Sequence, residues 1–209
     1  MKKVLCLTVL ALALPVATWA NSTQIVFHNS GGKISSNGTT LTLANSTLTS
    51  FTTLGGTTYT GNLGTVSFTT GSLVSGNLGV NGVFNSGGGF TIAGNGTNGI
   101  PVGVLFTGSF SGPATWQGTF NAAGNNHHGN WTYTLTASVQ GKLSNGTNAF
   151  GGTLQFSFDV PKSKEFGKGV VVNLNDGVTS ITVPEPGTLS LFGTGLLGLA
   201  GLIRRKLSA

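Results

Sequence analysis

The sequence contains little charge, and half of its cations are grouped in two short runs. Asp, Glu, Lys and Arg make up 7% of the chain, whose formal net charge is +6. Lys2, Lys3 and the run 204–206 supply five cations, which leaves residues 21–183 with five cations against three anions. A net charge of +2 (five minus three) gives no basic patch for a phosphate backbone. We therefore expect no nucleic-acid partner, and we interpret "KSKEFGK" at 162–168 as a solvated loop.

Cysteine is almost absent, which excludes several kinds of site. The single Cys6 lies in "MKKVLCLTVLALALPVATWA", which has the charged, apolar and small-residue parts of a secretory signal. We predict that residues 1–20 are a signal peptide with a helical apolar part, recognised by the Sec translocon and cleaved by signal peptidase after Ala20. The alternative is an uncleaved membrane anchor. A mature chain without cysteine excludes disulfides, zinc–cysteine sites and cysteine nucleophiles.

Groups for acid–base or metal chemistry are also scarce. Residues 21–183 contain three carboxylates, whereas paired-carboxylate catalysis needs two that converge on one bond. His127 and His128 are adjacent, and neighbouring residues of a strand point to opposite faces, so we interpret the pair as a loop tip and not as metal ligands completed by His28. "GSFSG" at 108–112 lies within a strand pattern and lacks a following helix. We expect no catalytic residue, no metal, no cofactor and no enzymatic activity. The three carboxylates are Asp159, Glu165 and Asp176.

Residues 21–183 show no helical periodicity, and their pattern predicts strands. Apolar residues alternate with Thr and Ser in stretches such as 130–139 and 152–160, and Asn-Gly turns separate them. The pattern predicts an all-β domain, an antiparallel β-sandwich or jelly roll, with a β-solenoid as the alternative. Residues 31–62, which are poorer in hydrophobic side chains, are expected to form a peripheral hairpin layer. Residues 166–183 are expected to form a final hairpin that turns at Asn175.

Aromatic side chains supply most of the expected core. Trp131 and Tyr133 lie on one face of a strand by the period of two, which favours a core face. Trp116, Trp131 and Tyr133 are also the candidates for a platform that stacks on a sugar ring, with Trp116 or Trp131 as the main contact. The expected aromatic core consists of Phe68, Phe84, Phe90, Phe106, Phe110, Trp116, Phe120, Trp131, Tyr133, Phe156 and Phe158.

Residues 184–209 have the composition of a membrane-targeting segment. Pro184, Glu185 and Pro186 precede an uncharged stretch at 188–203, which is followed by Arg204-Arg205-Lys206. Sixteen helical residues at about 1.5 Å each span ~24 Å, which flanking cations can extend toward the ~30 Å hydrocarbon core. We predict one transmembrane helix at 188–203, with the cations on the cytoplasmic side and residues 21–187 outside. A buried helix is the alternative.

The order of these parts resembles the PEP-CTERM sorting signal of bacterial exosortase substrates. The resemblance covers residues 183–206: Val183-Pro184-Glu185-Pro186-Gly187, the apolar stretch and the three cations. It implies an envelope with an outer membrane, in which a membrane-embedded exosortase recognises Pro184-Glu185-Pro186 and removes the helix. It also implies transient anchoring in the inner membrane and a final location at the cell surface or in the extracellular matrix.

The sequence thus predicts three parts: a signal peptide (1–20), a β-rich extracytoplasmic domain (21–183) and a sorting signal (184–209). The expected function is that of an exported structural or interaction protein of the cell surface or matrix. The alternative is a carbohydrate-binding module whose partner is a matrix polysaccharide.

Overall fold

Strands form most of the described chain. The computed structural model describes residues 23–122, 129–161 and 165–183. The predicted signal peptide at 1–20 and the predicted sorting signal at 184–209 lie outside these residues. In chain order the elements are β1 (Thr23–Ser30), β2 (Lys33–Ser36), β3 (Leu41–Thr52), β4 (Thr58–Thr69), β5 (Leu73–Gly76), β6 (Asn81–Phe84), β7 (Gly87–Asn95), η1 (Thr97–Gly99), β8 (Val102–Phe110), β9 (Ala114–Asn121), β10 (Asn130–Leu143), β11 (Asn148–Pro161), β12 (Val171–Asn173) and β13 (Asp176–Val183).

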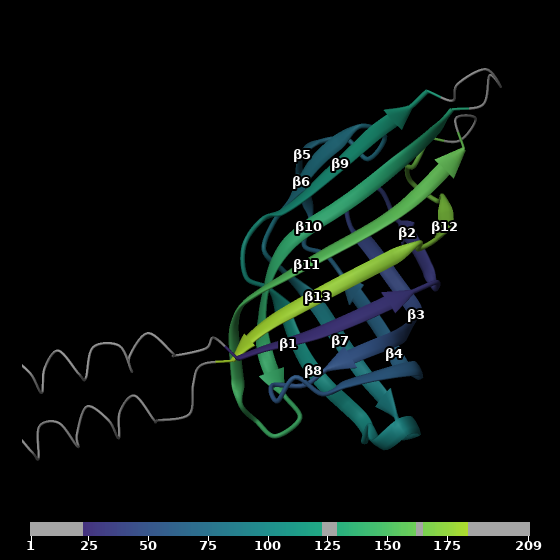
Figure 1. Cartoon of the computed structure of the whole chain (residues 1–209). Helices are drawn as coiled ribbons and strands as arrows, with labels where there is room; N and C mark the ends of the chain where they lie inside the picture. Colours follow the sequence, from purple (N-terminus) through teal and green to yellow (C-terminus); the bar gives the residue numbers. More distant parts are fainter. Residues whose placement is uncertain (1–22, 123–128, 162–164, 184–209) are drawn as a thin grey trace, which may run out of the picture. The chain divides into compact units, whose positions relative to one another are not determined.

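Eight of these strands form a closed antiparallel barrel (Figure 1). Hydrogen bonding follows the order β11-β13-β1-β3-β4-β7-β8-β10, and β10 pairs with β11 to close the ring. Closure leaves none of the eight strands with an unpaired edge along the ring. Strands from the first and last parts of the described chain, β1 and β13, are therefore neighbours.

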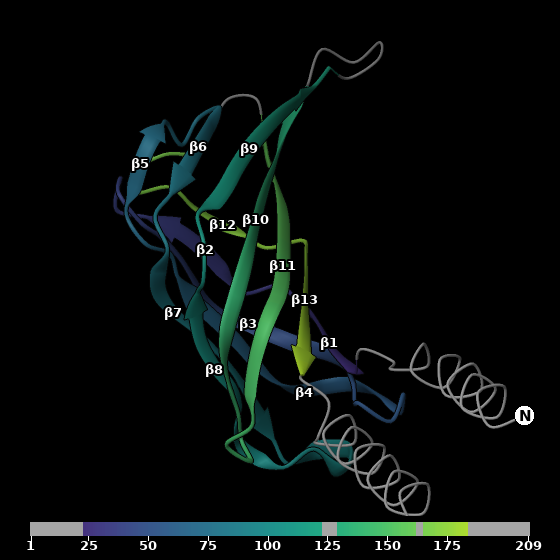
Figure 2. The ribbon, with the colours of Figure 1, turned by 90° about the vertical axis from the view of Figure 1, so that its left-hand side faces the viewer.

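Further strands extend from the barrel on two sides (Figure 2). The 14-residue β10 pairs with β8 through Val139–Leu143 and with β9 through Asn130–Thr136. Strand β9 pairs in turn with β6, and β6 with β5. We call β5, β6 and β9 the flange. Elsewhere, β2 pairs with β3 and β12 pairs with β2.

The β10–β11 hairpin shows how Asn-Gly sequences produce the tight turns of this fold. Asn145 Oδ1 accepts a hydrogen bond from the Thr147 backbone N–H at 3.0 Å. Gly146 has φ +81°, and its N–H donates to the Leu143 carbonyl at 2.9 Å. Asn satisfies the turn through its own side chain, and Gly adopts the left-handed conformation without a Cβ clash.

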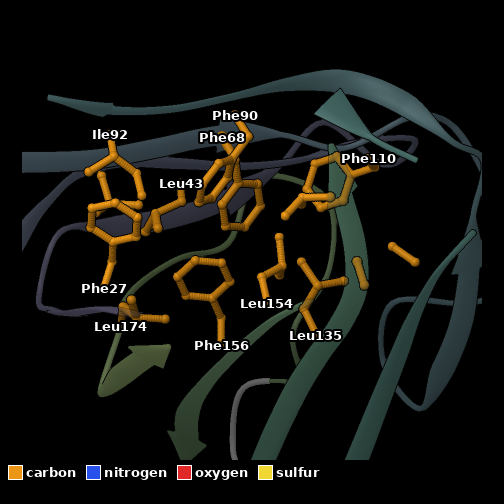
Figure 3. Packing of buried hydrophobic residues seen from close by; sticks show 14 of the residues in the cluster. Phe27, Leu43, Phe68, Phe90, Ile92, Phe110, Leu135, Leu154, Phe156 and Leu174 are labelled. Carbon is orange, nitrogen blue, oxygen red and sulfur yellow. The ribbon is translucent and has the colours of Figure 1, made fainter. Parts of the chain in front are cut away.

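Side chains from opposite walls meet inside the barrel (Figure 3). Phe68 on β4 and Phe156 on β11 are four strands apart around the ring, yet their ring centroids are 4.9 Å apart. Phe68 also contacts Phe110 edge-on at 5.8 Å, and Phe90 approaches Phe156 at 6.5 Å. An eight-stranded barrel is just wide enough to be filled by its own side chains. The barrel interior is accordingly a packed core.

The structure confirms the all-β antiparallel class but not the arrangement expected from the sequence. A closed barrel with extra strands stands in place of the β-sandwich or jelly roll, and the β-solenoid alternative is wrong because the barrel is antiparallel. Alternating apolar residues show that one face of each strand is buried, but they do not show which strands pair. Opposite barrel walls that touch through Phe68 and Phe156 present the same alternation as two packed sheets.

Two local expectations were also wrong. Residues 31–62, expected to be peripheral, contribute barrel strand β3 and the start of β4, and Leu43 and Leu48 of β3 are at most 1% exposed. The expected final hairpin does not form, because β12 pairs with β2 whereas β13 pairs with β11. Long-range partners determine both outcomes, and local pattern does not report them.

Candidate functional site

The chain reaches the predicted sorting motif directly from a barrel strand. On β13, Gly177, Thr179, Ile181 and Val183 point inward and are buried, and the strand pairs with β11 from Thr153↔Ser180 to Ser157↔Asp176. The sorting motif therefore follows the last core side chain without a linker. The predicted site residues Ala20, Pro184, Glu185, Pro186, Arg204, Arg205 and Lys206, and the predicted helix at 188–203, lie outside the described residues.

The two ends of the described chain lie on neighbouring strands. The order β13-β1 in the ring places the start of β1 next to the end of β13, as Figures 1 and 2 both show. The first residues of β1 and the last residues of β13 thus lie at the same end of the barrel.

Asp159 forms part of a hydrogen-bonded chain across three strands and a loop. Its Oδ1 accepts from Thr132 Oγ1 at 2.6 Å, and its Oδ2 accepts from Asn175 Nδ2 at 2.8 Å. Thr132 Oγ1 itself accepts from Asn121 Nδ2 at 2.8 Å. Both carboxylate oxygens therefore have structural partners that link β9, β10, β11 and the segment before β13. The carboxylate therefore stabilises the contact between these strands and the loop through hydrogen bonds.

Tyr133 connects the flange side of β10 to two loops. Its hydroxyl donates to the Gly79 carbonyl at 2.8 Å and accepts from the Phe166 backbone N–H at 3.3 Å. Burial raises the pKa of the Tyr133 hydroxyl above its usual value. The Phe166 hydrogen bond opposes this rise in pKa, and the nearby Glu165 charge adds to it. The raised pKa extends to higher pH the range over which the hydroxyl stays protonated and donates to Gly79.

A second group of aromatic rings packs beside the flange. We call Trp116, Tyr133, Phe158 and Phe166 the aromatic cluster. Trp116 stacks on Tyr133 at 5.1 Å and lies 5.3 Å from Phe166, and Tyr133 stacks on Phe158 at 5.6 Å. Trp116 is 2% exposed, and its indole Nε1 donates to the Leu78 carbonyl at 2.9 Å. Tyr133 is likewise buried, so the expectation that Trp116 or Tyr133 could stack on a sugar is wrong.

Phe166 is the member of this cluster that sequence reasoning missed. It lies in "KSKEFGK", expected to be a solvated loop, but its side chain is 1% exposed. A single apolar residue among charges gives no period to detect, and its burial depends on Trp116 and Phe158 from distant strands. Only the lone Phe in that charged run hinted at an inward anchor.

Trp131 and Phe120 remain the aromatic pair at the surface. They are directly paired across β9 and β10, with ring centroids 5.3 Å apart. Phe120 is 39% exposed and Trp131 is partly buried. The prediction that Phe120 belongs to the core is therefore wrong. Of the predicted sugar-stacking residues, only Trp131 is not fully buried, and the exposed Phe120, which was not predicted as a stacking residue, lies beside it.

The remaining predicted candidates are dispersed. His28 lies exposed on β1, whereas His127 and His128 lie outside the described residues. The residues of "GSFSG" belong to the end of β8 and the turn after it, where Ser111 N–H donates to the Ser138 carbonyl at 2.9 Å. Within residues 23–122, 129–161 and 165–183, no three His, Cys, Asp or Glu side chains gather as a metal site would require. Over the same residues, the structure contains no helix with the length and apolar character needed to cross a membrane.

Comparison with known proteins gives one match. Neither a curated protein nor a solved structure shows significant similarity to this chain. A family model described as the PEP-CTERM protein-sorting motif matches residues 182–206, which begins at the last two residues of β13 and continues through the three cations. The chain therefore carries a PEP-CTERM sorting motif, which indicates an exported protein that is processed by exosortase.

Proposed function

We propose that the protein is a structural or interaction protein of the cell surface or extracellular matrix, held in the inner membrane until exosortase acts at Pro184-Glu185-Pro186. The family match over residues 182–206 carries this proposal. In it, residues 1–20 direct export through the Sec translocon, signal peptidase cleaves after Ala20, and residues 188–203 form the temporary anchor. Arg204, Arg205 and Lys206 keep the far side of that anchor in the cytoplasm.

We propose a passive cargo and not an enzyme, and the hydrogen bonds of two polar side chains support this proposal. Asp159 has both oxygens engaged by Thr132 and Asn175, and Trp116 is sealed against Leu78. The two polar side chains most typical of chemistry on this side of the molecule, Asp159 and Tyr133, thus fasten strands and loops together. We propose that the barrel contributes a stable surface and no catalysis.

The sorting proposal is tested in cells by substituting both prolines of the motif. Pro184→Ala with Pro186→Ala should leave the full-length protein in the inner membrane fraction, because exosortase no longer recognises its signal. The matched control is Pro113→Ala, a proline in the exposed β8–β9 turn, which should be processed normally. Fractionation and mass spectrometry of the C-terminus give the readout. A double variant that reaches the cell surface at the size of the wild-type protein would contradict the proposal.

A carbohydrate-binding role is the second candidate, and the exposed Phe120–Trp131 pair favours it. Adjacent aromatic rings can stack on the apolar face of a sugar. Titration with the cell's own polysaccharide should then change the fluorescence of the wild-type domain saturably, and Trp131→Phe should remove that change. Trp116→Phe is the control, because its ring is buried. If the fluorescence of the wild-type domain shows no saturable change, the carbohydrate-binding role is contradicted and only the structural role remains.

A further inference from the structure

The barrel connections that join β3 to β4, β7 to β8 and β10 to β11 lie at the same end as the two chain ends. Val26 near the start of β1 pairs with Thr52 at the end of β3. Asn98 of η1 donates from Nδ2 to the Thr60 carbonyl at 2.8 Å, which places η1 beside the start of β4. Ser144 N–H donates to the Leu105 carbonyl at 3.0 Å, which places the β10–β11 hairpin beside β8. Figures 1 and 2 both show these connections at the lower end of the barrel, which we call the terminal rim.

Large apolar side chains are exposed around the terminal rim. Leu54 of the β3–β4 hairpin is 42% exposed, and Phe150 near the start of β11 is 54% exposed. Val102 and Val104 at the start of β8 are 81% and 48% exposed. These residues come from three different connections, which follow one another around the ring. Such a distribution suits a partner with an extended, flat surface that accepts apolar side chains.

Most described charges lie away from the terminal rim, including Lys33 on β2 and Lys168 beside Gly38 of the β2–β3 turn. Asp159 lies near the end of β11, Glu165 follows it, and Asp176 begins β13, so all three described carboxylates lie at the end opposite the terminal rim. Lys142, near the end of β10, is exposed on the rim side. A surface without carboxylates approaches anionic lipid headgroups without repulsion, and a lysine is attracted to them.

The short segment between β13 and the predicted transmembrane helix limits how far the rim can lie from the membrane. Residues 184–187 separate Val183 from the uncharged stretch at 188–203. Fully extended, these residues reach at most ~14 Å at about 3.5 Å each. The polar region on each side of a bilayer is itself roughly 5–8 Å thick. If residues 188–203 span the membrane, the end of β13 lies within about 14 Å of the hydrocarbon. The headgroup layer occupies much of that distance, so the end of β13 lies close to the headgroups.

We propose that the terminal rim is a lipid-contacting surface, on which the barrel rests against anionic headgroups while the chain is anchored. This inference rests on the proposed function, since it requires residues 188–203 to be in the bilayer. Leu54, Val102, Val104 and Phe150 then lie at the depth where apolar side chains gain from partial burial among headgroups. Removal of the anchor leaves only this weak contact, so cleavage releases the barrel.

The test places one fluorophore at a time on the full-length chain. The background is Cys6→Ser, which makes each introduced cysteine unique. Val102→Cys and Phe150→Cys report the rim, and Leu196→Cys reports the anchor. The matched controls are Val74→Cys and Val171→Cys, because these valines are 54% and 55% exposed but lie on β5 and β12, away from the rim. The protein is reconstituted in vesicles of phosphatidylethanolamine and phosphatidylglycerol with nitroxide quenchers on headgroups or acyl chains.

The expected result is that headgroup quenchers reduce emission at positions 102 and 150 and leave positions 74 and 171 unchanged. Acyl-chain quenchers reduce emission at position 196. Adding Val102→Ser and Val104→Ser to the Phe150→Cys chain should lower the quenching at position 150, because the rim loses apolar contact. Quenching at 196 with rim positions no more quenched than the two controls would overturn the inference and leave the anchor standing. Absence of quenching at 196 would overturn the proposed anchoring, and the inference with it.

Discussion

The barrel interior and the aromatic cluster are two regions of one continuous core, and they are stabilised differently. The barrel interior is packed by phenylalanines such as Phe68 and Phe156, whose rings carry no polar atoms. In the aromatic cluster, Trp116 and Tyr133 each donate a hydrogen bond to a backbone carbonyl, of Leu78 and Gly79 respectively. Aromatic side chains thus contribute packing alone in one region and both packing and hydrogen bonds in the other.

The difference follows from sheet closure. In the barrel, strand pairing around the ring fixes the relative position of every wall, so side chains need only fill the space. The flange is an open extension. Its outer strand β5 pairs with β6 on one side only, and its first residue, Leu73, also donates from its N–H to the Thr39 carbonyl. Its loop at 78–80 is fastened by the polar tips of Trp116 and Tyr133. Closed sheets can rely on apolar packing, whereas open sheets gain from directional bonds.

The largest effect is expected from truncation inside the barrel. Phe156→Ala should lower the free energy of unfolding by about 3–5 kcal/mol, because it removes a fully buried ring between opposite walls and leaves a cavity. Phe150→Ala is the matched control on the same strand, where a 54% exposed ring should cost no more than ~0.5 kcal/mol. Urea unfolding of both variants measures the difference. Equal losses would show that the barrel interior is not the principal support.

A smaller and more local effect is expected at Trp116. Trp116→Phe keeps an aromatic ring but removes the indole donor to Leu78, which should cost about 1–2 kcal/mol. Amide hydrogen exchange should quicken in β5, β6 and the loop at 78–80 and stay unchanged in the barrel strands. Trp131→Phe, at a partly exposed ring, is the control. Equal acceleration in barrel and flange would show that the two regions unfold together and would remove the distinction drawn above.

The smallest effect, and the one with a pH signature, is expected at Tyr133. Tyr133→Phe removes the hydroxyl bonds to Gly79 and Phe166 and should cost about 1 kcal/mol at neutral pH. The folded-state pKa lies above the unfolded value of about 10, so the folded protein holds this proton more tightly. The stability contributed by the protonated hydroxyl is complete below pH ~10 and is lost as pH rises from there through the folded pKa.

The comparison that isolates this group is the wild-type protein against Tyr133→Phe from pH 8 upward. The difference in unfolding free energy should stay constant up to pH ~10 and then shrink, because only the wild-type protein has this proton to lose. Tyr59→Phe is the control for general alkaline effects. A difference that does not change above pH ~10 would show that the hydroxyl does not contribute through its protonated form.

Sequence reasoning succeeded where a local pattern reflects a local cause. The period of two in "YTLTASV" follows from the burial of one face of β10, and the Asn-Gly turn at 145–146 follows from left-handed backbone. The sorting motif was recognisable because its parts are contiguous, and the family match confirms it. The closure of the barrel was not predictable in this way, since it depends on β10 pairing with β8, β9 and β11 along its length.

The candidate site illustrates the same division. Trp116 and Trp131 look alike in sequence, but Trp116 is covered by Phe166 and by the loop at Leu78, which come from other parts of the chain. Likewise, nothing next to Asp159 in the sequence reveals that Thr132 and Asn175 engage both of its oxygens. Burial and partner choice are tertiary properties, so they became visible only with the fold.

The adjacency of β1 and β13 has a consequence for how the protein comes into being. A chain delivered residue by residue from its first residue, from a ribosome or through a pore, presents β1 early and must wait for β13. The ring cannot shut until nearly all of residues 23–183 have emerged, and such high contact order slows folding. Closure of the barrel is thereby delayed until β13 emerges. The strand that completes the structure is the one that leads into the sorting motif.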